Sequence, residues 1–267
     1  MLRLEDISLQ NGGFFEDNSY FCIRNSNYTS QLGMISEIEH DIIRIKQTLS
    51  DVWELLTEEE QHLLLNLIKT RYYQKNEVIY HVGDEPTCIF CVAKGKVKLS
   101  REGVGGRPQI TRMVKPKEFF GYRASFVNEC YTTDAIAFEE TVLLCIPLSV
   151  AKKIITQNNA VSIYFLKELA YYLGMAEEST VNLTQKHIRG RLAETLIRLK
   201  ENFGLTENGQ TLAIAASRED LANLSNMTTS NAIRTLSAFA QEGLVKIDGR
   251  HITILDEQQL AKVSEIG

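Results

Sequence analysis

The chain has 267 residues, enough for two domains that each bury their own core, and its composition is that of an ordinary globular protein. No apolar run approaches membrane-spanning length and the N-terminus lacks a charged-then-apolar signal pattern, so we expect a cytoplasmic protein with no membrane partner. The net charge of −5 argues against bulk binding of nucleic acid. Residues 184–267, however, carry 10 Lys/Arg and 10 Asp/Glu, and this neutral part is compatible with specific DNA binding if its basic residues share one face.

The cysteines and histidines indicate no catalytic or metal site. Five cysteines form an odd, scattered set that fits a reducing compartment. Cys88 and Cys91 have a spacing that can bind metal or perform redox chemistry, but no second pair lies at a zinc-site distance. If this segment is a strand, the two sulfurs point to opposite faces, which favours a structural role. None of the five histidines lies in a recognisable nucleophile context, so we expect no enzymatic activity, no metal and no cofactor.

Residues 1–50 are expected to be an N-terminal extension with a short helix. Residues 1–33 are rich in Asn, Ser and Gly and show no clear period. Over residues 34–49 a narrow apolar seam of the coiled-coil kind consists of Ile35, Ile38, Ile42, Ile45 and Leu49. We favour packing of this seam on the protein's own surface. A capping box at residues 57–60 begins another helix, whose predicted buried face is Leu63, Leu64, Leu67 and Ile68.

Residues 51–157 are expected to form a β-roll domain, because short strand-like runs dominate residues 71–147. At least six such runs at near-regular spacing predict a small antiparallel barrel or jelly-roll, and with the helices the fold class is α+β. Turns are expected at Gly83, Gly95, Gly105, Gly106 and Gly121. Such a roll encloses an apolar cavity, which suits a small effector.

A long helix is predicted over residues 158–184, after a short helix that Ser149 caps behind Pro147. Its main apolar stripe, at spacings of three and four, consists of Leu166, Leu169, Leu173, Ala176, Thr180 and Leu183. A second stripe beside it consists of Ile163, Ala170 and Gly174. One stripe can pack on the roll while the other meets a twin helix in a parallel dimer, and we favour this dimerisation helix over a helix with one buried side.

Residues 185–267 are expected to form a winged helix-turn-helix domain. Lys186 begins a helix that ends near Gly204 and buries Ile188, Leu192, Leu196 and Leu199. Residues 217–239 then read as two short helices joined by a tight turn at Asn226, because Asn tolerates left-handed backbone.

Both short helices carry capping residues. Ser217 caps the first with Asp220 completing an acidic capping box, and Thr228 or Thr229 caps the second. The inward positions of the second helix are expected to be Ala232, Ile233, Leu236 and Phe239.

The outward, N-terminal side of this second helix is the candidate DNA-reading surface, made of Thr229, Ser230, Asn231 and Arg234. In a helix-turn-helix these positions approach base edges and phosphates in the major groove, and an Arg there can bind guanine with two hydrogen bonds. The other interpretation is an ordinary helical hairpin with a solvated polar face.

A β-hairpin follows closely, which makes the unit a winged helix. Leu244, Val245 and Ile247 form one strand and Ile252 and Ile254 the return strand, with Asp248-Gly249 as the two-residue turn. On the wing, Arg250 and His251 either contact a phosphate or form an exposed turn. Lys186 is a further candidate phosphate contact.

The order of these parts resembles the family of the cyclic-AMP receptor protein and the fumarate-nitrate regulator (Crp/Fnr). The resemblance covers residues 52–264 and rests on GRLAETL, SREDLANLSNMTTSNAIRTL and the EGL…DGR wing, with GDEP, GKVKL and EFFGYRASF in the roll. It implies a homodimeric bacterial transcription regulator with an effector-sensing N-terminal domain. By position it implies a DNA-contacting set of Arg218, Thr229, Ser230 and Arg234. Many members have Arg-Glu where this chain has Thr229-Ser230, so the resemblance gives the mode of DNA binding but not the target sequence.

The predicted effector pocket departs from the cyclic-nucleotide pattern of that family; its residues are Gly121, Tyr122, Arg123, Thr132, Thr133 and Asp134. The family has Gly-Glu at the start of the phosphate-binding cassette and Arg near its end, where this chain has Tyr122 and Thr133. A buried cyclic phosphate needs a cation or several N–H donors. In an extended segment Arg123 would point away from Tyr122 and could not easily substitute. We therefore expect that cyclic AMP is not the effector, and that Tyr122 partly fills the cavity and leaves a smaller, less charged ligand or none.

The sequence thus predicts a homodimeric transcription regulator that binds double-stranded DNA at an inverted repeat, with RNA polymerase and an unknown small-molecule effector as further partners. Two alternatives stay open. One is a cyclic-nucleotide-binding regulator, and the other is a small-molecule sensor whose winged helix binds a protein partner. Iron–sulfur chemistry is not expected, because only Cys22 lies near the N-terminus.

Overall fold

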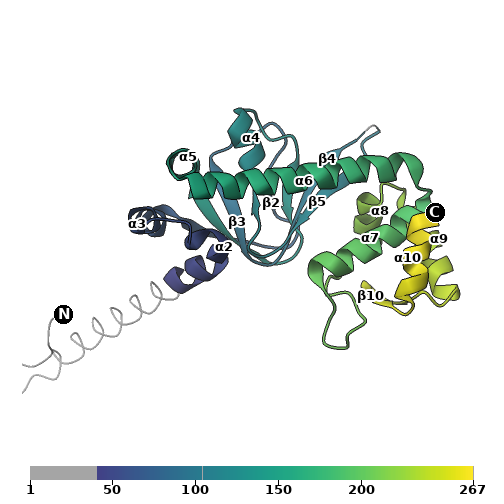
Figure 1. Cartoon of the computed structure of the whole chain (residues 1–267). Coiled ribbons are helices and arrows are strands. Elements are labelled where there is room, and N and C mark those ends of the chain that lie inside the picture. Colours follow the sequence, from purple (N-terminus) through teal and green to yellow (C-terminus); the bar gives the residue numbers. More distant parts are fainter. Residues whose placement is uncertain (1–40, 104, 267) are drawn as a thin grey trace, which may run out of the picture. The chain divides into compact units, whose positions relative to one another are not determined.

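The computed structural model describes residues 41–103 and 105–266, and Ile45–Gly267 forms one compact unit (Figure 1). Its N-terminal part is an antiparallel β-roll of eight strands, which confirms the α+β fold. One sheet has the order β1-β8-β3-β6, with bounds Lys69–Tyr73, Thr141–Pro147, Cys88–Lys94 and Phe119–Phe120. The other has the order β2-β7-β4-β5, with bounds Val78–Tyr80, Asp134–Ala137, Val97–Glu102 and Pro108–Val114. All five predicted turn glycines have a positive φ.

Strand β3 separates two apolar clusters, because its side chains alternate between the faces of the sheet. Cys88, Phe90 and Val92 face the inner cluster, which lies between the sheets and includes Tyr80, Phe120, Tyr131 and Ala135. Ile89 and Cys91 face the outer cluster, which lies under the helices and includes Leu49, Trp53, Leu64 and Phe165. The two sulfurs therefore lie on opposite faces, and the four cysteines among the described residues are free thiols.

The helices that contribute to the outer cluster include α2 (Ser50–Trp53), α3 (Glu58–Leu67) and α5 (Leu148–Gln157). The predicted capping box of α3 is present, with the Glu60 amide donating to Thr57 Oγ1 and the Thr57 amide donating to Glu60 Oε2. Trp53 is 8% exposed, and Lys46 Nζ lies 5.8 Å from the centroid of its ring. Leu67, predicted to be buried, is 40% exposed because it is the last residue of α3.

The seam predicted over residues 34–49 falls only partly within the described residues. Residues 41–48 are helical, and Ile45 and Leu49 are 5% and 2% exposed in the outer cluster. These two residues pack on the protein's own core, as we favoured. Ile35 and Ile38 lie outside the described residues.

Two local expectations in the roll are wrong. Ser149 does not cap α5, because the helix begins at Leu148 directly after Pro147 and has no side-chain cap. Residues after Gly121 are not extended, because α4 (Tyr122–Val127) is a helix that begins there. Gly121 has φ +83°, and a Cβ at this position would lie 3.2 Å from the Phe90 ring, so the close turn into α4 requires glycine.

The long helix α6 (Asn159–Gln185) is capped by Asn158, whose side chain accepts a hydrogen bond from the Val161 amide. The next helix, α7 (Ile188–Phe203), begins two residues later than predicted, because Lys186 is the C-cap of α6 and His187 the N-cap of α7. It ends at Gly204 as expected. Ile188, predicted to be buried, is 39% exposed at the first turn of α7.

The C-terminal part consists of α8 (Arg218–Leu224), α9 (Thr229–Gln241), β9 (Val245–Asp248), β10 (His251–Ile254) and α10 (Glu257–Ile266). Its core is made of fully buried side chains such as Leu192, Leu196, Leu221, Leu236, Phe239 and Ile252. Helix α10, absent from our expectations, packs on α7 and buries Leu260. Its sequence signal is Asp256, whose carboxylate accepts from the Gln259 amide as an N-cap does. No helix in the described part of the chain is long and apolar enough to cross a membrane.

Candidate nucleic-acid interface and effector cavity

The helix-turn-helix is built as the capping residues predict. Ser217 Oγ accepts from the Asp220 amide and the Asp220 carboxylate accepts from the Ser217 amide, which completes the capping box of α8. The turn passes through Asn226, whose φ of +49° lies in the left-handed region. Thr228, rather than Thr229, caps α9 and accepts from the Asn231 amide.

The first turn of α9 presents polar side chains to solvent. Thr228, Thr229 and Ser230 are exposed, and the Arg234 guanidinium donates to Asn231 Oδ1. The hydrogen bond brings Arg234 and Asn231 together, and Thr229 and Ser230 are exposed at the start of the same helix. This arrangement offers hydroxyl, amide and guanidinium groups of the kind that read base edges in the major groove.

One inward position of α9 was predicted wrongly. Ile233 is 47% exposed, whereas Ala232, Leu236 and Phe239 are buried as expected. The buried side is completed by Thr235 instead, because the core takes positions 232, 235, 236 and 239 of the helical repeat. Ile233 thus joins the exposed side, where an apolar side chain can contact a thymine methyl group.

The wing lies beside the N-terminus of α8. Asp248 pairs with His251, so the two turn residues are Gly249 and Arg250, one position later than predicted. Arg218 Nη2 donates to the Gly249 carbonyl at 2.9 Å, which ties the wing to α8. Arg250 and His251 are exposed at this turn.

Lys186, a predicted phosphate contact, is paired with a glutamate of its own chain. Its Nζ lies 3.1 Å from Glu194 Oε2 at the junction of α6 and α7, and both side chains are largely buried. The ion pair neutralises the charge that a phosphate contact would require.

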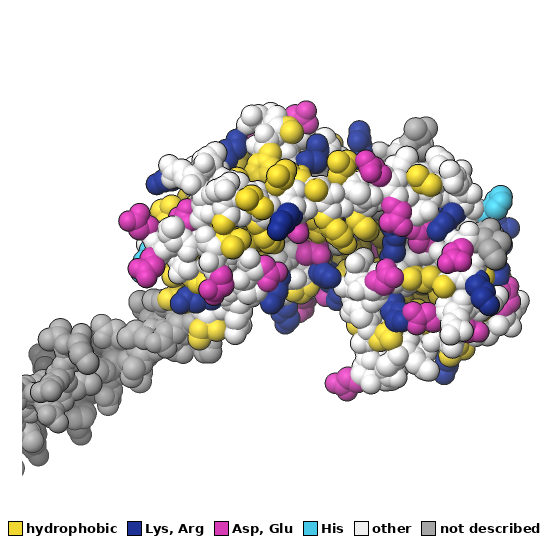
Figure 2. All heavy atoms as spheres, viewed as in Figure 1, with side chains coloured by type: hydrophobic (Ala, Val, Ile, Leu, Met, Phe, Trp, Pro, Cys, Tyr) yellow, Lys and Arg dark blue, Asp and Glu magenta, His cyan; other side chains and the backbone are white. Residues whose placement is uncertain are grey.

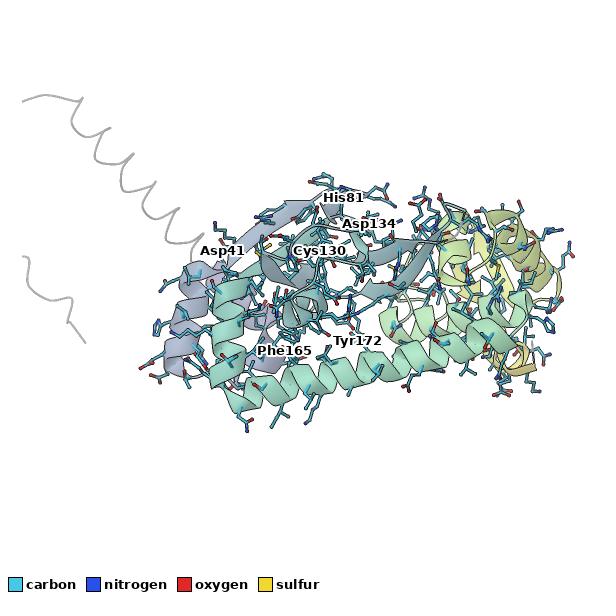
Figure 3. All side chains as sticks on the ribbon, turned by 90° about the horizontal axis from the view of Figure 1, so that it is seen from above. Asp41, His81, Cys130, Asp134, Phe165 and Tyr172 are labelled. Carbon is cyan, nitrogen blue, oxygen red and sulfur yellow. The ribbon has the colours of Figure 1, made fainter. Side chains whose placement is uncertain are left out.

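A cavity of about 560 Å³ extends from the roll, along α6, to α7 and α8. Five of the six predicted effector residues line it: Gly121, Tyr122, Arg123, Thr132 and Thr133. Asp134 does not, because its carboxylate accepts from the Val82 amide at 2.9 Å and lies 3.4 Å from His81 Nδ1. Figure 3 shows Asp134 and His81 together, away from α6.

The helical turn at α4 changes the expected roles of two residues. Tyr122 is 3% exposed and packs edge-on against Phe165 of α6, so it forms part of the wall and leaves the cavity large. Burial raises the pKa of its phenol, which keeps it neutral. Arg123 Nη2 donates to Thr132 Oγ1 at 2.8 Å on the cavity wall, which the alternation argument for an extended segment did not allow.

The cavity also contains an arginine that our sequence reasoning missed. Arg112 of β5 stacks on Tyr172 of α6 at 3.5 Å from the ring centroid, donates to the Tyr172 hydroxyl, and pairs with Glu118 at 3.3 Å. The sequence did contain a signal for this residue. Arg112 alternates with Ile110 and Val114, which face the interior of the roll, and a charged side chain at an inward strand position needs a partner.

The cyclic nucleotide-binding domain model matches residues 70–158, and the Crp-like helix-turn-helix domain model matches residues 190–263. The chain is 23% identical over 192 residues to the CRP-like cAMP-activated global transcriptional regulator of Mycobacterium tuberculosis, covering 71% of this chain and 85% of that protein. It is 25% identical over 215 residues to the Cyclic AMP receptor protein of Thermus thermophilus, covering 80% and 97%. The chain belongs to the Crp/Fnr family.

The solved structures agree on the fold. FixK2 from Bradyrhizobium japonicum has a TM-score of 0.67 at 22% identity, covering 74% of this chain and 97% of that one. This Crp/Fnr protein is thus a transcription regulator of that type, with a cyclic-nucleotide-binding-like domain followed by a helix-turn-helix domain.

In this Crp/Fnr regulator, neither predicted stripe of α6 packs mainly on the roll. The contact is made by Val161, Phe165 and Tyr172, which point from α6 to the roll, as Figure 3 shows for Phe165 and Tyr172. Leu166, Leu173 and Ile163 are 65%, 61% and 44% exposed on the other sides of the helix, and Ala170 and Gly174 are exposed as well. Ala176 and Thr180 are also exposed, but they border the cavity. Leu169 and Leu183 are half-buried. Figure 2 shows hydrophobic side chains gathered along α6.

The roll of this Crp/Fnr regulator also holds the helix-turn-helix through one ion pair. Lys98 Nζ of β4 lies 2.9 Å from Asp220 Oδ1 of α8, and the two side chains are 18% and 14% exposed. Burial by itself would raise the pKa of Asp220, but hydrogen bonds from Ser217 and Lys98 outweigh it and hold the pKa below its usual range.

Asp220→Asn should therefore change how stability depends on pH. Because the pKa of Asp220 is lowered on folding, its contribution is complete above the unfolded pKa, near pH 4, and disappears as the pH falls through the folded value. We expect the variant to be about 1–2 kcal/mol less stable than the wild type at pH 7, and we expect this difference to shrink as the pH falls below about 5. Urea unfolding at stepped pH measures this, with Glu219→Gln in the same helical turn as the control. A parallel acid decline of wild type and Asp220→Asn would contradict the assignment.

Proposed function

We propose that this regulator is a homodimer that binds an inverted-repeat operator through α9 and responds to a small molecule in its cavity. The division of labour is a sensing roll (residues 51–157), a dimerisation helix (158–184) and a DNA-binding domain (185–267). RNA polymerase is its expected protein partner on DNA. The observation that carries the proposal is the exposed polar first turn of α9 beside the wing.

The DNA-contacting set follows from position and exposure. Arg234, Thr229 and Ser230 lie where a recognition helix meets base edges, and Thr228 and Asn231 close the first turn of α9. Ser217 and Arg218 lie at the N-terminus of α8, and Arg250 lies at the wing tip. These N-terminal and wing positions suit phosphate contacts, which fix the register of the protein on the duplex.

Dimerisation is supported by the exposed apolar stripes of α6. Leu166 and Leu173 are more than half exposed although they are large and apolar. Ala176 and Thr180 follow at helical spacing and also border the cavity. Burial of such a stripe against a twin helix removes it from water and sets two recognition helices about one DNA turn apart, roughly 34 Å.

The cyclic-nucleotide alternative has support from relatives named for cyclic AMP and from the matching domain model. Against it stands the chain itself, where Thr133 and Tyr122 occupy the family positions of Arg and Glu. Arg123 lies on the cavity wall, so it is the residue that would anchor a cyclic phosphate if one bound. We therefore propose that cyclic AMP is not the effector and make this a test.

The other alternative, a winged helix that binds a protein partner, predicts no salt-dependent shift of DNA. Specific DNA binding releases counterions, so its affinity must fall steeply with salt. An electrophoretic shift of the regulator's own promoter fragment over a salt series separates the two.

Arg234→Ala should cost about 1–3 kcal/mol of binding free energy and relax preference at one base pair in each half-site. The reason is the loss of a guanidinium that can bind guanine at two atoms. Fluorescence anisotropy on an operator selected from a random DNA pool measures both effects, and Arg107→Ala on the roll is the control. Unchanged affinity and preference in Arg234→Ala would show that α9 does not read the operator.

Arg250→Ala should weaken binding to all DNA sequences alike, because we propose that Arg250 contacts a phosphate.

Leu166→Glu combined with Leu173→Glu should give monomers, because each chain would bury two charges in the proposed interface between the two α6 helices. These residues are preferable to Leu169, which also packs on the outer cluster of the same chain. Sedimentation velocity measures the state, and Tyr171→Glu, 57% exposed on the opposite side of α6, should leave the dimer intact. A dimeric double variant would place the interface elsewhere.

Isothermal titration with cyclic AMP and cyclic GMP should give no micromolar, one-per-chain binding. The position of the family Arg holds Thr133, which supplies no charge to a buried phosphate. A one-per-chain curve for either nucleotide would reject this prediction. Loss of that curve in Arg123→Gln would then identify Arg123 as the anchor.

A further inference from the structure

The cavity continues well past the roll into a region that we call the hinge end, lined by Leu183, Arg191, Glu194, Arg198 and Leu224. Guanidinium groups outnumber carboxylates in the whole lining. Four arginines line it, Arg112, Arg123, Arg191 and Arg198, against two carboxylates, Glu118 and Glu194. A cavity with this excess of cations favours an anionic occupant.

Three buried side-chain nitrogens have no hydrogen-bond acceptor among the described residues, and all three belong to arginines of this cavity: Arg112 Nε, Arg191 Nε and Arg198 Nη2. Buried donors are nearly always satisfied in folded proteins, so three on one cavity indicate a missing acceptor. Arg198 Nη2 is the least telling, because it lies 3.0 Å from Glu178 and 3.1 Å from Glu194 without alignment along an N–H bond.

Arg191 differs from the other two arginines because its positive charge has no carboxylate partner among the described residues. Its Nη1 donates to the Leu183 carbonyl at 3.3 Å and its Nη2 to the Asn226 carbonyl at 3.1 Å, but no carboxylate among the described residues pairs with it. Arg112 and Arg198, by contrast, have glutamate partners. Burial lowers the pKa of the Arg191 guanidinium, which is the effect expected of a cation that lacks a counter-ion.

The rest of the wall suits an apolar or aromatic body. Leu169, Met175, Leu199 and Tyr172 line the stretch between the hinge end and the roll. The volume of about 560 Å³ is that of an ordinary small-molecule site.

We propose that the hinge end binds the anionic group of a small molecule, a carboxylate, sulfonate or phosphate, through Arg191 Nε–H, while an apolar or aromatic body lies along α6. This site uses α7, outside the cassette of the roll and outside residues 70–158. This proposal rests on the proposed function, because it takes the cavity to be the effector site. The same guanidinium holds the Asn226 carbonyl, the turn that leads to α9, so an anion at Arg191 acts directly on the DNA-reading helix.

The test uses two dyes with the same kind of aromatic body and different charge, anilinonaphthalene sulfonate and neutral N-phenylnaphthylamine, titrated by fluorescence into the full-length protein. The sulfonate should bind one per chain. Arg191→Gln should weaken it about tenfold or more, because a hydrogen bond to a charged group is lost. The neutral dye should bind the variant and the wild type alike. Arg189→Gln, on the same helix and paired with Glu242, should leave both dyes unchanged.

A second pair of variants tests the charge without touching Arg191. Ser179 lines the cavity from α6, so Ser179→Glu adds a negative charge to the wall and should repel the sulfonate, whereas Ser179→Gln of nearly equal size should not. Near-UV circular dichroism checks that each variant is folded.

The proposal is wrong if sulfonate affinity in folded Arg191→Gln stays within twofold of wild type, or if the neutral dye weakens equally. If Arg191→Gln does not fold, equal sulfonate binding by the two Ser179 variants overturns it. No DNA is present, so this result is independent of the operator test with Arg234→Ala.

Discussion

The packing of Phe165 fixes where the rest of the molecule can lie. Its ring lies 5.4 Å from Phe119, 5.4 Å from Tyr122 and 5.9 Å from Phe126, and each pair meets edge to face. Such contacts favour definite ring orientations, so they set the rotation of α6 about its axis as well as its position. With that rotation set, Tyr172 two turns later covers the cavity and stacks on Arg112, while Leu166 and Leu173 face away from the roll. One aromatic cluster therefore decides which side of α6 faces the cavity and which side faces solvent.

A charge pair and apolar contacts both connect the roll with the helix-turn-helix, because Phe138 and Met113 of the roll pack in the C-terminal core. The Lys98–Asp220 pair joins β4 to α8, and the same carboxylate completes the capping box of that helix. A shift of the roll that separates the pair would therefore also disturb the start of α8. Breaking a largely buried pair is costly because it leaves a desolvated charge. The ion pair and the start of α8 are thus coupled, because both depend on the same carboxylate.

The sequence predicted the elements whose signals are local. The capping boxes at Thr57 and Ser217 depend on side chains three residues apart, and the left-handed turn at Asn226 on a single residue. The β-roll and the winged helix followed from alternation and turn residues, and the first-turn residues of α9 followed from helical spacing.

The predictions that were wrong concerned positions set by contacts between distant segments. The roll takes Phe165 and Tyr172 rather than either regular stripe of α6, and the core under α9 takes Thr235 rather than Ile233. Asp134 turns to the Val82 amide, and the arginines of the cavity come from β5, α4 and α7, which are far apart in the chain. Apolar spacing within one element shows which faces can be buried, but not which of them a distant element will cover.

Trp53 gives the molecule an optical property that divides it in two. It is the single tryptophan of the chain, and it is buried in the outer cluster under the helices of the roll. The core around Leu196 and Phe239 holds no tryptophan, so melting of the winged helix alone would leave the indole emission unchanged. Far-ultraviolet circular dichroism registers both halves, because both contain helices. Recording the two signals on one sample would therefore resolve whether the winged helix and the β-roll unfold together.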